Sequence, residues 1–181
     1  MRIKMTLLDS SLARAFLLQY KRLLGDVAAK PMKSSNDYND ARDLLYQDGL
    51  NRVYVFDSSY EESFVLAVRS AIHGMFIYAK KYKDGYALKA LDNAWFCVKA
   101  LTTPLEVMIP DWVVIDTAVL PYEGFFICDG LVVNRQTYIG PNMINSMTQE
   151  LKTERKKWSS NPALERTVGS PPLASAARRQ R

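Results

Sequence analysis

The chain has 181 residues, of which 48% are hydrophobic and 24% charged, proportions typical of a globular protein and not of a disordered one. Its net charge of +5 is concentrated at the C-terminal end. The residues from Trp158 onward carry four basic side chains and one acidic side chain, which leaves +2 for residues 1–157. This nearly neutral body gives little support to charge-driven nucleic-acid binding. The two cysteines, Cys97 and Cys128, lie in apolar runs, which favours buried reduced thiols over a disulfide framework.

The N-terminal segment, residues 1–9, lacks the apolar core of a signal peptide. No window of the chain approaches the roughly 18 apolar residues that a membrane span needs. These two observations predict a cytoplasmic protein without a membrane segment.

Apolar residues recur at three- and four-residue spacing over residues 12–24, which predicts an amphipathic helix. Asp9, Ser10 or Ser11 can cap its start. Either Gly25 or the segment 28–31 stops it, because Pro31 has no amide donor and disfavours helix in the residue before it. A polar loop over residues 33–39 is expected to follow, and then a short second helix through residues 41–46, with Asn39 or Asp40 as its cap and Asp48-Gly49 as its C-terminal exit.

The segment Ser58–Glu62 combines a capping serine with acidic residues, which is typical of a helix start. We expect this third helix to run from about Tyr60 to His73 and to be closed by Gly74. His73 would then be the last helical residue before the cap.

From Met75 onward the period of the apolar residues becomes strand-like. Residues 75–82 and 86–91 flank Asp84-Gly85, a pair that suits a tight hairpin loop. Residues 94–101 alternate between two faces and predict a third strand. Residues 102–110 contain two prolines and predict a single helical turn.

The stretch 120–134, which reads LPYEGFFICDGLVVN, is typical of a β-hairpin. We expect one strand over residues 112–120, a turn at Glu123-Gly124 and a return strand over residues 125–133. Helices followed by about five antiparallel strands predict an α+β fold, because strands and helices do not alternate as they do in a parallel doubly wound sheet.

Pro141 can open a last helix that ends near Trp158 and carries cations in its final turns. Residues 159–181 are rich in Ser, Pro, Ala and Arg without apolar periodicity, and they are predicted to be a disordered basic tail. Residues 1–158 would form a single α+β domain with the N-terminal helices packed on the sheet.

The sequence contains few candidates for a functional site. Tyr122, Glu123 and Asp129 are candidate binding residues in the closing hairpin, and Asp129 stands out because a carboxylate in an apolar strand needs a partner or water. His73 is the only histidine, and one histidine with two separated cysteines lacks the ligand spacing of a zinc site. No metal site and no catalytic residue are therefore predicted. The chain has no GxGxxG, Walker or GxSxG sequence, so no cofactor is expected either.

The segment LPYEGFFICDGL at residues 120–131 resembles uncharacterised bacterial proteins with a leucine-proline-aromatic-x-glycine segment followed by an aspartate-glycine pair. Residues 16–24 and 41–46 are similar to the N-terminal helices of such proteins, although Cys128 stands where a tyrosine is expected. The tail at 161–181 resembles read-through ends encoded beside repetitive or mobile DNA. This resemblance to a domain of unknown function implies a fold and no activity.

The first functional hypothesis is a non-catalytic protein-binding module of the bacterial cytoplasm, of an accessory or immunity-like kind, because an aromatic-rich sheet comes without a catalytic constellation. A nucleic-acid-binding protein is the alternative, using Lys80, Lys81 and Lys83 with the basic last helix. A third hypothesis is an enzyme with an acid–base site near Asp129, whose partners would be Glu123, Asp116 and His73.

Overall fold

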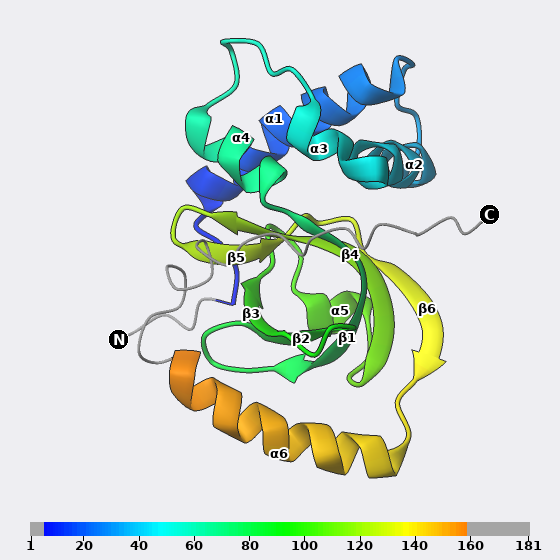
Figure 1. Ribbon diagram of the computed structural model, residues 1–181, viewed down its shortest axis with the longest axis vertical. Helices are drawn as coiled ribbons and strands as arrows, with labels where there is room; N and C mark the ends of the chain where they lie inside the picture. Colours follow the sequence, from blue (N-terminus) through cyan, green and yellow to red (C-terminus); the bar gives the residue numbers. More distant parts are fainter. Residues whose placement is uncertain (1–5, 159–181) are drawn as a thin grey trace, which may run out of the picture.

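The computed structural model of the protein describes residues 6–158. Figure 1 shows helices α1–α4 on one side of a curved sheet and helix α6 on the other. Helices before the sheet and a helix after it confirm the predicted α+β class. The elements are α1 (Ser10–Ala28), α2 (Ser35–Tyr46), η1 (Gln47–Gly49), α3 (Leu50–Val53), α4 (Glu62–Arg69), β1 (Ile72–Lys81), β2 (Tyr86–Ala90), β3 (Trp95–Lys99), α5 (Leu105–Met108), β4 (Val113–Tyr122), β5 (Phe125–Cys128), β6 (Val133–Tyr138) and α6 (Pro141–Trp158).

Side-chain caps determine where the first two helices begin. Asp9 accepts hydrogen bonds from the first-turn amides of α1, so this helix starts where the sequence predicts. Ser34 caps α2 and forms a reciprocal capping box with Asp37. Because this box nucleates α2 at Ser35, the predicted polar loop over residues 33–39 is wrong for most of its length.

The third predicted helix ends earlier than expected. Helix α4 stops at Arg69, and the chain extends into β1 from Ile72 onward, so the prediction of a helix reaching His73 is wrong. The physical reason is that β1 pairs with β4 from its first residue, Ile72 opposite Val119. The apolar residues keep a helical spacing up to Ile72, but the long run of hydrogen bonds between β1 and β4 outweighs this local preference.

Five strands close into a barrel. Strand β1 pairs antiparallel with β2 and β4, β2 pairs with β3, and β4 pairs with β5. A short parallel pairing between β3 and β5 completes the ring, so the expectation of a purely antiparallel sheet is corrected by one pair. Closure gives each of the five strands two neighbours and leaves no free edge among them. Helix α5 lies between β3 and β4 in the chain.

The closing hairpin is partly as predicted. Strands β4 and β5 meet at Glu123 and Gly124, which have φ values of 48° and 78°. The single return strand expected over residues 125–133 is wrong beyond Cys128, because the backbone turns at Gly130 with φ 85°. The chain then forms a sixth strand, β6, which pairs with the first half of β4 while β5 pairs with the second half.

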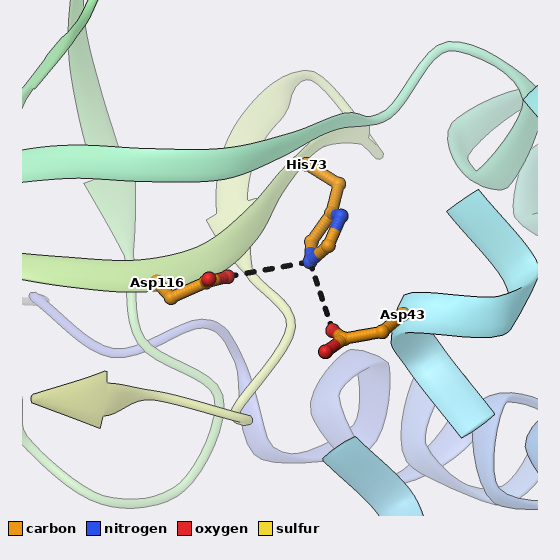
Figure 2. Close-up of side chains that lie close together, drawn as sticks. All are labelled: Asp43, His73 and Asp116. Atoms are coloured by element: carbon orange, nitrogen blue, oxygen red, sulfur yellow. Dashed lines mark ion pairs between the residues drawn. The ribbon is translucent and has the colours of Figure 1, made fainter. Parts of the chain in front are cut away.

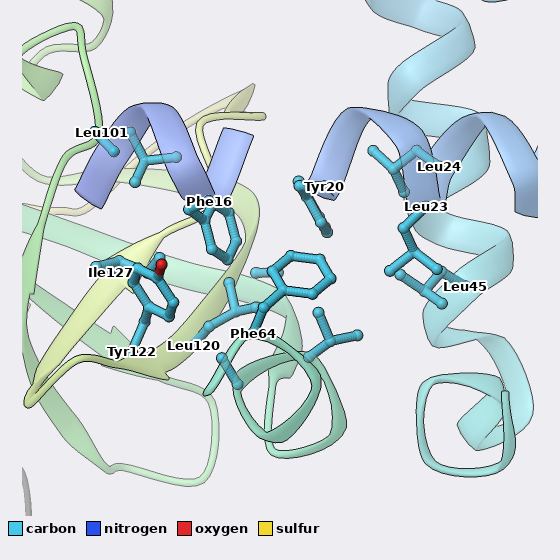
Figure 3. Close-up of a cluster of buried hydrophobic side chains, with 14 of the residues drawn as sticks. Phe16, Tyr20, Leu23, Leu24, Leu45, Phe64, Leu101, Leu120, Tyr122 and Ile127 are labelled. Atoms are coloured by element: carbon cyan, nitrogen blue, oxygen red, sulfur yellow. The ribbon is translucent and has the colours of Figure 1, made fainter. Parts of the chain in front are cut away.

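The helical layer packs on the outer face of β4 and β5 through one apolar cluster (Figure 3). Phe16 lies at its centre, with its ring centroid 5.2 Å from Tyr20, 5.5 Å from Phe64 and 5.2 Å from Tyr122. Alternate residues of β4 face opposite sides. Those that join the helical cluster are Ala118, Leu120 and Tyr122, and those that join the barrel interior are Val113, Ile115 and Val119.

The last predicted helix is confirmed as α6, which covers the outer face of β1, β2 and β3. Its buried residues Met147 and Leu151 form an apolar cluster with Ala87 and Trp95 of the sheet. No helix within residues 6–158 is both long and apolar enough to cross a membrane. The predicted disordered tail lies outside the described residues.

Candidate functional site

Asp129 follows β5 and is only 1% exposed to solvent. The hydroxyl of Tyr20 donates a hydrogen bond to its Oδ2 at 3.1 Å, and the hydroxyl of Thr117 donates to its Oδ1 at 3.1 Å. The amide of Leu131 adds a third donor to Oδ1 at 2.9 Å. These donors come from the helical layer, the barrel and the loop before β6, so the carboxylate joins three parts of the fold.

Arg42 of α2 is the charged partner of this carboxylate and is also only 1% exposed. Its Nη1 lies 3.9 Å from Oδ2 of Asp129 and donates a hydrogen bond to the carbonyl oxygen of Leu131. Its Nη2 lies 3.3 Å from Oδ1 of Asp43 and 3.4 Å from Oδ1 of Asp116. One buried guanidinium therefore connects the Asp129 network to a second pair of carboxylates.

Burial dominates the ionisation of Asp129. It raises the pKa of this carboxyl from 3.8 to about 6, although Arg42 and the three hydrogen-bond donors act in the opposite direction. The same burial raises the pKa of the Tyr20 hydroxyl well above its usual value, so Tyr20 remains a hydrogen-bond donor at neutral pH.

Three side chains from three elements converge beside this network (Figure 2). The Nε2 atom of His73, on β1, lies 3.2 Å from Oδ1 of Asp43, on α2, and 3.3 Å from Oδ1 of Asp116, on β4. The strand register explains the approach of His73 and Asp116. His73 is opposite Ala118 and Asp116 is opposite Met75, so His73 and Asp116 are diagonal neighbours on one face of the sheet.

The surroundings of His73 fix its ring. The ring stacks on Tyr46 of α2 with centroids 5.1 Å apart and an interplanar angle of 23°. Burial and the nearby Arg42 lower the pKa of His73, against the raising effects of Asp116 and Asp43, so the neutral imidazole is favoured. Arg135 of β6 donates a hydrogen bond to the other oxygen of Asp116, Oδ2.

The three residues predicted as binding residues lie in different environments. Tyr122 is buried and packs edge-on against Phe16, Glu123 is exposed at the tip of the β4–β5 hairpin, and Asp129 is buried in the polar network. Among the residues considered for an acid–base site, His73 and Asp116 are in contact. Asp129 is linked to Asp116 through Arg42, which forms ion pairs with both carboxylates.

The lysines considered for nucleic-acid binding lie at the end of strand β1 or just after it, and the phenylalanine and the tyrosine of this strand lie inside the barrel. Phe76 and Tyr78 are buried in the barrel interior, so the interleaved aromatic pattern belongs to a core strand. Lys80 lies over the ring of Tyr82, and Lys81 forms an ion pair with Glu106. Helix α6 covers the outer face of β1–β3.

Sequence reasoning missed Arg42, Asp43 and Arg135. Arg42 lies next to Ala41 and one turn before Leu45, both of which are buried, and this place on the apolar side of α2 was the available signal. Asp43 is half-exposed on the same helix, and Arg135 lies on a strand that the sequence did not predict.

A separate concave surface lies along α1, and we call it the α1 groove. Its volume is about 550 Å³. Its lining residues are Leu7, Leu8, Ser10, Ala13, Arg14, Leu17, Leu18, Lys21, Leu101 and Thr102. Leu18 is 73% exposed although it is a large apolar residue, and Arg14 and Lys21 form no ion pair with any residue of the described part.

Comparison of the chain with protein-family models, with curated proteins and with solved structures found no match.

Proposed function

We infer that the chain is a non-catalytic protein-binding module whose α1 groove receives an amphipathic, acidic segment of a partner protein. The exposed Leu18 within this apolar groove is the observation that carries the proposal. An exposed apolar surface bordered by polar residues is typical of an interaction site.

Charge favours an acidic partner. Arg14, Leu18 and Lys21 follow one another at four- and three-residue spacing, so they share one face of α1. A segment that places an apolar side chain against Leu18 can therefore place carboxylates against Arg14 and Lys21. Such helix-and-groove recognition combines apolar anchors with charge pairs at the rim.

Other faces of the fold support this function less well. The β4–β5 hairpin, which the sequence suggested as a binding surface, is covered on one face by α1 and α4. The outer face of β1–β3 is covered by α6. An accessory or immunity-like role in a bacterial cytoplasm is part of the same proposal.

The substitution Leu18→Asp tests this function. It places a carboxylate in the apolar groove beside any acidic partner segment, so we expect partner capture from a bacterial lysate to fall by about tenfold or more. The matched control is Val107→Asp, because Val107 is also 73% exposed and does not line the groove. Capture is measured quantitatively with the full chain as bait at low and high salt.

Two further results are expected. The captured protein should dissociate at high salt, since Arg14 and Lys21 are exposed charges, and its cross-linked segment should be acidic. Equal capture by the wild-type chain and Leu18→Asp would show that the groove is not the interface. Recovery of a bound small molecule in place of a protein would also contradict the proposal.

A further inference from the structure

We propose that Asp43, His73 and Asp116 form a binding site for one divalent transition-metal ion, with Zn²⁺ as the best-fitting type. Each residue offers one ligand atom, and the three atoms lie within 4.8 Å of one another. They come from α2, β1 and β4, and so the fold and not the sequence spacing assembles the set. This site is independent of the α1 groove.

The two separations from His73 fit a tetrahedral ion. Ligands at about 2.0–2.2 Å from a tetrahedral zinc ion are separated from one another by about 3.3–3.6 Å. The Nε2 atom of His73 lies 3.2 Å from the Asp43 oxygen and 3.3 Å from the Asp116 oxygen, at or just below the lower end of this range. The two carboxylate oxygens lie within 4.8 Å of each other and complete the set.

The state of His73 is a second, independent observation. Its Nε2 atom is buried from solvent, and neither of the two carboxylate oxygens at 3.2 Å and 3.3 Å meets it with the geometry of a hydrogen bond. A buried ring nitrogen without a hydrogen bond is costly, and a bound cation would satisfy it. The stacked ring of Tyr46 holds the imidazole in this orientation, which is the role of an outer-shell group at a metal site.

Arg42 competes with the ion for the oxygens of Asp43 and Asp116, and its contacts with them are long enough to be replaced. Its Nη2 is 3.3 Å and 3.4 Å from the two carboxylate oxygens, whereas charge-assisted hydrogen bonds are typically about 2.7–2.9 Å. The Nε atom of Arg42 also donates to the Asp43 oxygen at 3.3 Å, so the ion must replace this contact as well as those of Nη2. The hydrogen bond from Nη1 to the Leu131 carbonyl and the ion pair with Asp129 would remain. Arg42 therefore keeps partners when the two oxygens turn toward a metal.

The local charge also favours a cation. Within the described residues, the three carboxylates of Asp43, Asp116 and Asp129 form ion pairs with two permanent cations, Arg42 and Arg135, so the network holds more carboxylates than such cations. One imidazole nitrogen with two carboxylate oxygens suits Zn²⁺ better than Mg²⁺ or Ca²⁺, which prefer oxygen ligands alone. Three protein ligands would leave a fourth position for water on the exposed side of Asp43.

The test is titration of the untagged full chain with ZnCl₂ by calorimetry and with CoCl₂ by visible absorption. We expect one ion per chain and the intense visible bands of tetrahedral Co²⁺. Because His73 is the only histidine, its imidazole signals in an NMR spectrum should shift on Zn²⁺ addition without ambiguity. His73→Asn and Asp43→Asn each remove one ligand, and each should weaken binding by about tenfold to a hundredfold or more.

Two control variants separate this site from a merely structural cluster. Arg135→Gln removes an exposed cation from Asp116, so it should strengthen Zn²⁺ binding by about threefold or more. Cys97→Ser removes the half-buried thiol, the other soft ligand near the surface, and should leave binding unchanged. Asp43→Asn changes a half-exposed side chain and should fold even if His73→Asn does not.

The outcomes are decisive in both directions. Weaker binding in Asp43→Asn together with tighter binding in Arg135→Gln supports the site. Absence of Zn²⁺ binding to the wild-type chain overturns it, and so does binding of equal strength in Asp43→Asn and wild type, since the ion would then lie elsewhere.

Discussion

Replacement of Asp129 by alanine is expected to lower the free energy of unfolding by about 3–5 kcal/mol, as is typical when one partner of a buried ionic network is removed. Three donors would lose their acceptor in a region that water does not reach: the Tyr20 hydroxyl, the Thr117 hydroxyl and the Leu131 amide. Arg42 would also lose its ion pair with Asp129, the carboxylate that is as deeply buried as the guanidinium.

Urea unfolding at pH 7 measures this effect. Asp129→Asn is the matched control, because its amide oxygen can still accept from the hydroxyl and amide donors on the Oδ1 side. We expect this variant to be clearly more stable than Asp129→Ala. A loss below about 1 kcal/mol in the alanine variant, close to the worth of a single ordinary hydrogen bond, would show that the network contributes little to stability.

The difference in unfolding free energy between the wild type and Asp129→Asn is expected to change with pH in one direction. The folded-state pKa of Asp129 is about 6, above the value of 3.8 for the unperturbed group. Between these two values the folded chain binds more protons than the unfolded chain at this position. The part of the Asp129 contribution that depends on proton binding is therefore complete below about pH 4 and is lost as the pH rises through 6, by an amount on the order of 3 kcal/mol, while the hydrogen bonds that the carboxylate accepts remain.

The measurement is the difference in unfolding free energy between wild type and Asp129→Asn from pH 4 to pH 7. As the pH rises, the wild type should lose stability relative to Asp129→Asn. A flat difference would mean that Asp129 is ionised throughout this range and that its hydrogen bonds outweigh its burial.

Local signals predicted the elements whose ends are set by nearby residues. Helix α1 begins at the cap Asp9 and α6 begins at Pro141, as the sequence indicates. The Asp84-Gly85 loop and the Glu123-Gly124 turn also fall where predicted. In each case the determining contact lies within four residues along the chain, so the sequence alone contains it.

Predictions failed where a distant segment decides the conformation. His73 continues a helical pattern in the sequence, yet it lies in strand β1 because β1 pairs with β4. Its neighbour in space, Asp116, is distant in the sequence. Strand β5 ends at Cys128 because the chain turns at Gly130. Beyond the turn, β6 and not β5 pairs with β4. Neither event leaves a local pattern of hydrophobic residues that could reveal it.

The convergence of Asp43, His73 and Asp116 fails to appear in the sequence for the same reason. A strand register must be known before His73 and Asp116 become diagonal neighbours, and the packing of α2 on the sheet must be known before Asp43 joins them. Asp129 differs, because a carboxylate in an apolar strand already implied a buried partner. The sequence therefore indicated that a polar network exists and could not indicate its members.

Phe16→Ala is expected to destabilise the protein by about 3–5 kcal/mol, the usual cost of removing a buried aromatic ring. Phe16 is fully buried and contacts the rings of Tyr20, Phe64 and Tyr122, which belong to α1, α4 and β4. The cavity would open between the helical layer and the barrel (Figure 3), so the surrounding rings cannot all move to fill it. Urea unfolding should show a lower midpoint with an unchanged slope.

The location of the damage distinguishes this effect from general destabilisation. Amide hydrogen exchange should accelerate most in α1, α4 and the β4–β5 hairpin, which share the Phe16 cluster, and least in β2 and β3, which pack against the barrel interior and α6. Phe16→Leu retains most of the apolar volume and should cost much less. Uniform acceleration across all strands would instead mean that the helical layer and the barrel unfold as one unit, because the loss of a contact in one layer would then be felt equally in the other.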